Sequence, residues 1–170
     1  MDDIAERAGV SKPVLYQHFP GKLDLYLALL DDGIASLLET LRSALEATHD
    51  NKQRVRGAIS AYFGFIDDPD GAYRLVFESD LTNEPAVRDR IEQADAACAA
   101  MLSHVISADT GLSEAQAHLL AAGLLGMAQI AARSWLRDPE ALTREDAVAI
   151  IASLGWRGIG GFPLTHPPTD

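Results

Sequence analysis

The chain has 170 residues, of which 48% are hydrophobic, and its formal net charge is −11. This length suits one domain, or a small module joined to a larger one, and glycine and proline are too few to indicate disorder. The single cysteine, Cys98, excludes an intrachain disulfide, and no Cys/His pattern indicates zinc. Because Leu and Ala are abundant and no segment alternates as a strand does, we expect an all-α protein.

The composition also bears on where the protein works. The first residues are acidic rather than basic and then apolar, so they do not resemble a secretory signal. The most apolar run, residues 119–132, is too short to cross a bilayer. We therefore expect a soluble, cytoplasmic protein with no membrane partner, no cofactor and no metal.

Residues 1–22 are expected to form two short helices. The first ends at Gly9, which can adopt a left-handed conformation. Ser11 is an N-cap candidate for the second helix, and Pro13 falls in its first turn, where a missing N–H costs little. This helix runs to about Phe19, and the following Pro-Gly pair ends it. Two short helices joined by a tight turn form a helix-turn-helix pattern.

The second of these helices has one side suited to burial and one suited to contact with DNA. At 100° per residue, Leu15 and Phe19 fall together on the buried side. The opposite side and its flanks carry Pro13, Val14, Tyr16, Gln17 and His18. In the major groove, Gln17 can pair bidentately with adenine, Val14 can contact a thymine methyl, and Lys12 can reach guanine or phosphate. The alternative is an ordinary solvent-exposed helical turn.

The charge distribution sets this segment apart from the remainder of the chain. Three basic residues balance three acidic ones within residues 1–22, so the whole net charge of −11 lies in residues 23–170. No acidic residue occurs between Arg7 and Lys22. The helix-turn-helix is therefore a neutral-to-basic patch on an acidic body, whose own field opposes DNA.

Six more helices are expected from apolar spacing and cap residues. They cover Lys22 to about Ala47, Lys52 to about Ile66, Ala72 to about Leu81, residues 86–107, a helix from the Ser113 cap to Arg137, and a helix from Thr143 to about Gly158. Ser113 with Gln116 forms a capping-box pattern. Because the first of these helices follows the Pro-Gly pair directly, we expect it to join the two parts of the chain rigidly.

The run MDDIAERAGVSKPVLYQHFPGKLDLYLALLD closely resembles the helix-turn-helix of the TetR family of bacterial transcriptional regulators. The matching features are IAERAGVS, then LYQHF, then GK opening a long helix, and they cover residues 1 to about 32. The resemblance implies that Lys12, Pro13, Val14 and Gln17 face bases. It also implies that Tyr16, His18 and Lys22 contact the DNA backbone. The candidate DNA-binding residues are thus Ser11, Lys12, Pro13, Val14, Tyr16, Gln17, His18 and Lys22.

The resemblance also implies a domain organisation and a function. We expect a DNA-binding unit over 1–22, a connecting helix over 22–47, a helical ligand-binding and dimerisation domain over 48–160 and a poorly ordered tail over 161–170. The expected function is a ligand-responsive repressor that binds a palindromic double-stranded DNA operator as a homodimer, with an unknown small-molecule effector.

In this family a further helix precedes the pair, and we expect that such a segment is omitted ahead of Met1. The alternative is a ligand-binding helical dimer with impaired or lost DNA binding. An enzyme is not expected, because no nucleophile elbow, metal motif or phosphate-binding loop occurs.

Two sets of residues in the body are candidates for the sites that the resemblance implies. For the dimer interface they are Leu120, Leu124, Met127, Ala131, Val148, Ile151 and Leu154, on two apolar helices near the C-terminus. For the ligand pocket they are Tyr62, Phe63, Tyr73, Phe77, Met101, Met127 and Trp135. For both sets the alternative is an ordinary position in the core of one chain.

Overall fold

The computed structural model of the chain describes residues 1–68 and 83–158. Within these residues the elements are α1 (Asp2–Arg7), α2 (Lys12–His18), α3 (Lys22–Glu46), α4 (Asn51–Asp67), α6 (Pro85–Thr110), α7 (Glu114–Leu136) and α8 (Arg144–Arg157). The predicted all-α fold is confirmed. The helix expected over 72–81 and the expected tail lie outside the described residues.

Local sequence signals account for most helix ends. The Ser113 hydroxyl accepts from the Gln116 backbone N–H at 3.4 Å, while the Gln116 side chain accepts from the Ser113 N–H at 3.1 Å, so the predicted capping box forms. At the start of α8, Thr143 Oγ1 accepts from the Asp146 N–H at 3.2 Å. Ser11 occupies the N-cap position of α2, but its side chain makes no cap hydrogen bond.

α6 runs about one turn further than its apolar spacing indicates. It continues to Thr110 and ends at Gly111, whose φ of 70° lies in the left-handed region that only glycine adopts at little cost. The extension carries Asp109 to the end of α6, where it contacts α4.

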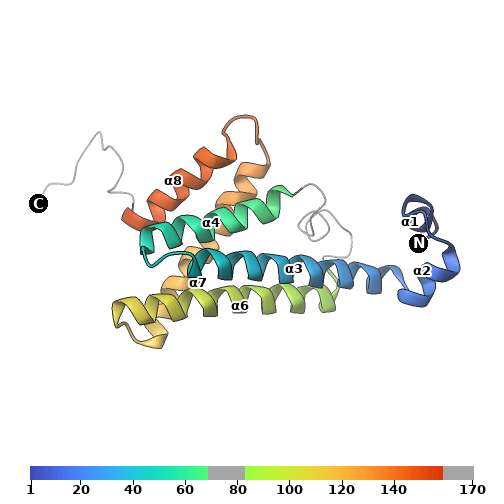
Figure 1. Cartoon of the computed structure of the whole chain (residues 1–170), viewed down its shortest axis with the longest axis horizontal. Coiled ribbons are helices and arrows are strands. Elements are labelled where there is room, and N and C mark those ends of the chain that lie inside the picture. Colours follow the sequence, from blue (N-terminus) through green and yellow to red (C-terminus); the bar gives the residue numbers. More distant parts are fainter. Residues whose placement is uncertain (69–82, 159–170) are drawn as a thin grey trace, which may run out of the picture.

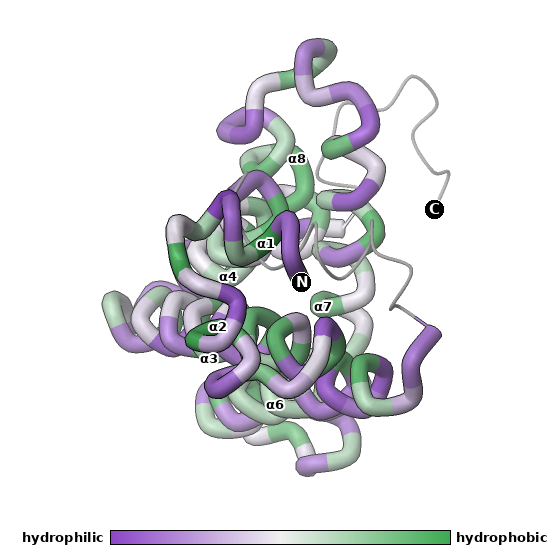
Figure 2. Tube along the Cα trace, turned by 90° about the vertical axis from the view of Figure 1, so that its right-hand side faces the viewer, coloured by the Kyte–Doolittle hydropathy of each residue, from purple (hydrophilic) through white to green (hydrophobic). Residues whose placement is uncertain are grey.

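α3 is the axis of the molecule. Figure 1 shows α1 and α2 at one end of α3, and α4, α7 and α8 gathered around its other half. α6 lies beside α3 over most of its length and runs in the same direction, from the α1–α2 end to the far end. Figure 2 shows hydrophilic and hydrophobic residues alternating around the turns of α3 and α6, as expected for helices with one buried face.

Two apolar clusters lie along α3. The neck cluster, near the start of α3 and α6, consists of Tyr26, Leu30 and Val87 with the partly buried Leu23, Leu27, Ile34 and Ile91. Beside it, Arg90 Nε donates to Asp31 Oδ1 at 2.7 Å, which joins α6 to α3. The body core, around the second half of α3, contains Leu37, Leu41, Leu45, Ile59, Tyr62, Phe63, Ile66, Cys98, Ala128, Ala132, Ala147, Val148 and Ala152.

α8 packs closely on α4 and α7 at Gly155. A Cβ atom at this residue would lie 3.1 Å from Met127 Cε and 3.4 Å from Val55 Cγ1. The missing side chain therefore lets the end of α8 approach both helices. This packing brings the neighbouring Trp156 to the rim of a cavity.

Candidate functional site

The two short helices form a small unit at the end of α3. Ala5 of α1 and Leu15 of α2 are buried, and Gly9 supplies the positive φ of 66° that the turn between the helices needs. Phe19, expected on the buried side with Leu15, is half-buried. The helical wheel therefore predicted the inward face of α2 correctly.

The eight candidate DNA-binding residues are all exposed in this unit: Ser11, Lys12, Pro13, Val14, Tyr16, Gln17, His18 and Lys22. Val14 and Tyr16 are unusual among them, because these large apolar or aromatic side chains keep 43% and 46% exposure. An exposed valine and tyrosine beside the amide of Gln17, the imidazole of His18 and the ammonium of Lys12 give α2 the chemistry of a surface that contacts base edges and phosphates.

One of these residues already has an acidic partner in the chain. Lys12 Nζ forms an ion pair with the Asp2 carboxylate of α1, and both side chains are more than half exposed. The hydrogen bond to Asp2 raises the pKa of Lys12, so its ammonium stays charged at any physiological pH. A DNA phosphate that binds Lys12 must compete with Asp2 for it.

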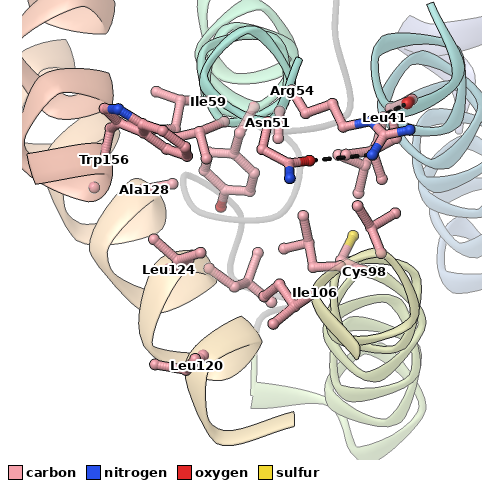
Figure 3. A pocket seen from close by; sticks show the side chains of 18 of the residues that line it. Leu41, Asn51, Arg54, Ile59, Cys98, Ile106, Leu120, Leu124, Ala128 and Trp156 are labelled. Carbon is pink, nitrogen blue, oxygen red and sulfur yellow. Dashed lines mark hydrogen bonds between the residues drawn. The ribbon is translucent and has the colours of Figure 1, made fainter. Parts of the chain in front are cut away.

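A cavity of about 380 Å³ lies in the body, at the end of α3 that is far from α2. It is enclosed by the second halves of α3 and α6, the first halves of α4 and α7, and the end of α8. Its lining is mainly aliphatic: Leu37, Leu41, Leu45, Val55, Ala58, Ile59, Leu102, Val105, Ile106, Leu120, Leu124, Leu125 and Ala128. Figure 3 shows Leu120, Leu124 and Ile106 across the cavity from Arg54 and Asn51.

Within the described part of the chain, the charged residues of this lining are Arg54 and Asp109. Arg54 Nε donates to the carbonyl oxygens of Leu45, at 3.0 Å, and Thr48, at 2.7 Å. Its Nη1 donates to Asn51 Oδ1 at 3.1 Å and to Asp109 Oδ2 at 2.6 Å. The guanidinium is thus held at one edge of an otherwise apolar space, where the ends of α3 and α6 meet the start of α4 (Figure 3).

Of the five predicted pocket residues that the structure describes, the cavity includes only Tyr62. Phe63 and Trp135 instead pack on each other in the core, with ring centroids 5.7 Å apart, and Trp135 Nε1 donates to the Leu142 carbonyl at 2.7 Å. Met101 and Met127 pack against the body core. Aromatic and methionine side chains at helical spacing fill space here rather than leave it empty. The other two candidates, Tyr73 and Phe77, lie outside the described residues.

Sequence reasoning did not find the polar edge of this cavity. Arg54 lies on the same face of α4 as the apolar residues Val55, Ala58 and Tyr62. A cation on an apolar helix face was the sequence signal that could have indicated a polar edge. The aliphatic lining gave no such sequence signal, because leucines that line a cavity have the same spacing as leucines that fill a core.

A second polar contact crosses between α6 and α7. Gln129 Nε2 donates to Asp95 Oδ1 at 2.6 Å. Burial raises the pKa of Asp95, while Gln129 and the nearby Arg133 oppose this shift. Burial, helped by the Asp95 charge, also raises the pKa of the Cys98 thiol to about 11. Cys98 therefore stays a neutral thiol and serves as a small core residue.

The predicted interface residues do not share one exposed face. Leu120 is exposed at the cavity, and Val148 is 4% exposed within the body core. The others are partly buried: Leu124, Met127, Ala131, Ile151 and Leu154. A different stripe of α7 is open to solvent, with Leu119 and Ile130 74% and 63% exposed around Gly123 and Gly126.

α7 is also long and apolar enough to meet the length and composition of a membrane span, and the described residues contain no other such helix. The 14-residue apolar run seen in the sequence lies within this helix, whose ends agree with the span expected from Ser113 to Arg137. Core and interface helices of soluble proteins share these properties. No group of three or more metal-binding side chains occurs among the residues that the structure describes.

Comparisons with known proteins agree with this architecture. Residues 1–29 match the family model described as bacterial regulatory proteins, tetR family. The chain is 43% identical over 166 residues to the HTH-type transcriptional activator FasR of Mycolicibacterium smegmatis, covering 98% of this chain and 76% of that protein.

Two solved structures share the fold. A TetR-like transcriptional regulator from Rhodococcus sp. RHA1 has a TM-score of 0.72 at 22% identity, covering 95% of this chain and 84% of that one. The regulator FadR from Bacillus subtilis, in complex with stearoyl-CoA, has a TM-score of 0.74 at 17% identity, covering 93% and 87% of the two chains.

Proposed function

Because the chain belongs to the TetR family of transcriptional regulators, which bind DNA, we propose that it is a homodimeric regulator whose DNA binding responds to a small molecule with a long apolar chain. A transcriptional regulator acts on DNA inside the cell. The observation that carries the proposal is the position of two features at opposite ends of α3. The exposed surface of α2 lies at one end, and the apolar cavity lies at the other.

The DNA contacts we propose follow from the exposed face of α2. Gln17 and Val14 contact base edges in the major groove, with Lys12 and Pro13 beside them. Tyr16, His18, Lys22 and Ser11 contact phosphates and set the register. In a two-fold dimer, the same contacts repeat on the second half of a palindromic operator.

For the dimer we propose the exposed stripe of α7, with the outer face of α8 beside it. Leu119 and Ile130 supply apolar area, and Gly123 and Gly126 let a second helix approach closely. Ile150 of α8, a helix that packs on α7, is also 45% exposed. Such a surface on a water-soluble regulator needs a partner, and a second copy of the chain provides a matching one.

For the effector we propose a ligand with a long aliphatic chain. The cavity's aliphatic lining and its volume, within the usual range for ligand sites, support this. FadR of Bacillus subtilis, which shares the fold, was crystallised with stearoyl-CoA. The aliphatic chain of the ligand would contact Leu37, Leu41 and Leu45 of α3. Because α3 follows α2 directly in the sequence, a bound ligand can bias the position of α2.

The sign of regulation is the remaining part of the proposal. The family resemblance predicted a repressor, whereas the FasR relative is named an activator. At 43% identity over nearly the whole chain, this relative favours activation. A reporter gene under the promoter next to the protein's own gene, with and without the protein, separates the two signs.

DNA binding is tested by fluorescence anisotropy with DNA from around the protein's own gene, titrated over a salt series. Gln17→Ala is expected to weaken binding by roughly tenfold for each half-site, and a salt-dependent affinity marks phosphate contacts. Gln93→Ala is the matched control, because it removes an exposed amide side chain from α6, which is not part of the helix-turn-helix. Equal affinity of wild type and Gln17→Ala would contradict the recognition surface. Binding by neither would favour a ligand-binding dimer without DNA binding.

A further inference from the structure

Among the described residues that line the cavity there is one cation, Arg54, and backbone oxygens hold it in place. The carbonyl groups of Leu45 and Thr48, at the end of α3, both accept from its Nε. The guanidinium side chain is 13% exposed, so it is fixed rather than mobile in solvent. Its Nη1 edge remains directed at Asp109 and Asn51.

Asp109 is a less secure partner than these carbonyls. It lies in the last turn of α6, where a negative charge opposes the negative end of the helix dipole. Its side chain is 33% exposed, and it reaches the guanidinium through one nitrogen, Nη1. A carboxylate in this position can turn into water when another anion takes its place.

The chemistry of the cavity beyond this edge is aliphatic. Leu41, Leu102 and Ala128 are part of its wall, and Arg54, Asp109, Asn51 and Thr110 form a polar group at one side. A ligand that fills such a space has an apolar chain and one polar end next to Arg54. Because Arg54 is a fixed cation, an acidic end gains more there than a neutral one.

We propose that the cavity binds an aliphatic chain with an anionic end, and that this anion displaces Asp109 from Arg54. This inference rests on the proposed function and specifies its ligand. Arg54 anchors the anion, Asn51 stays beside it, and the apolar chain lies along α3 and α7. The carboxylate of a fatty acid and the phosphates of its coenzyme A ester share the required chemistry.

The test measures binding of dodecanoate, 1-dodecanol and lauroyl-CoA to the full chain by calorimetry and by tryptophan fluorescence, since Trp156 is at the cavity. We expect dodecanoate to bind about tenfold more tightly than 1-dodecanol. Arg54→Gln abolishes this preference and keeps 1-dodecanol binding. Arg56→Gln, on the exposed side of the same helix, leaves the preference unchanged.

Asp109→Asn gives a change of opposite sign. Removal of the competing carboxylate tightens dodecanoate binding several-fold and leaves 1-dodecanol binding unchanged. If Asp109 only joins the two helices, this variant leaves the ratio of the two affinities as in wild type, and the displacement is refuted.

The remaining outcomes separate the ligand sources and the two proposals. Tighter binding of lauroyl-CoA than of dodecanoate, lost in Arg54→Gln, assigns the coenzyme A ester; if that binding survives the substitution, Arg54 is not the anchor. Equal binding of dodecanoate and 1-dodecanol by wild type refutes the anionic end but supports the apolar chain. Binding of no probe refutes the proposed cavity ligand itself.

Discussion

The ion pair between Asp2 and Lys12 makes a prediction about DNA binding. Lys12 is a candidate contact to guanine or phosphate, yet in the protein without DNA it is paired with an acidic side chain of α1. In Asp2→Asn this competition is removed, and Lys12 can bind DNA without losing a partner. We therefore expect the variant to bind DNA more tightly than wild type.

The expected gain in DNA affinity follows from the exposure of the ion pair, and the expected change in salt dependence follows from the number of phosphates that Lys12 neutralises. Both side chains are more than half exposed, at 55% and 59%, so water screens the ion pair and its effect on DNA affinity is modest. A dimer breaks two such pairs, so the gain in DNA affinity is roughly fivefold. Each Lys12 that neutralises a phosphate steepens the dependence of log affinity on log salt by about 0.9. For two half-sites the slope becomes steeper by up to about 1.8.

The assay is fluorescence anisotropy of labelled operator DNA at four or more salt concentrations. The matched control is Asp3→Asn, which removes the same charge from the same turn of α1 but leaves the ion pair to Lys12 intact. Equal effects of the two variants would attribute the change to net charge rather than to the pair. Weaker binding by Asp2→Asn would refute the reasoning, since it would mean that Asp2 positions Lys12 for DNA.

Three further predictions concern the body. Ile130→Glu places a charge on the proposed dimer face of α7 and is expected to give monomers in size-exclusion chromatography with light scattering, whereas dimers would contradict the proposed face. Val87→Ala opens a cavity in the neck cluster, where the side chain is 0% exposed, and is expected to lower the free energy of unfolding by about 2 kcal/mol in urea titrations; a loss below about 0.5 kcal/mol would mean that the neck is loosely packed. Because burial raises the pKa of Asp95 above its ordinary value, the free energy of unfolding falls as pH rises through the titration of this carboxyl group. Asp95→Asn avoids that loss and is expected to be more stable than wild type at pH 7 but not at pH 3, whereas a pH-independent gain would contradict the cause.

Local features of this protein could be predicted because short stretches of sequence determine them. The turn at Gly9, the capping box of Ser113 with Gln116 and the cap at Thr143 each involve residues at most three apart. The buried side of α2 also followed from spacing alone, since Leu15 and Phe19 lie one turn apart. The helix-turn-helix was therefore evident before any fold was known, and with it the family.

The sites in the body could not be predicted in this way. Arg54, at the start of α4, and Asp109, at the end of α6, are 55 residues apart in sequence. They meet because α3 and α6 run in parallel, so that the end of α6 lies beside the end of α3, where α4 begins. The cavity depends on where packing leaves a gap, and Phe63 and Trp135, which have the composition of a pocket, close their gap by packing on each other.

The exposed face of α7 shows the same division between sequence and tertiary structure. The sequence determined that α7 is a helix with apolar residues on more than one side. Which side is left open was decided by the packing of α7 against α4, α6 and α8, which covers Ala121, Ala128 and Ala132 and leaves Leu119 and Ile130 in solvent. Periodicity gives the direction of each side chain around its own helix, but only the neighbouring helices determine which of those directions is buried.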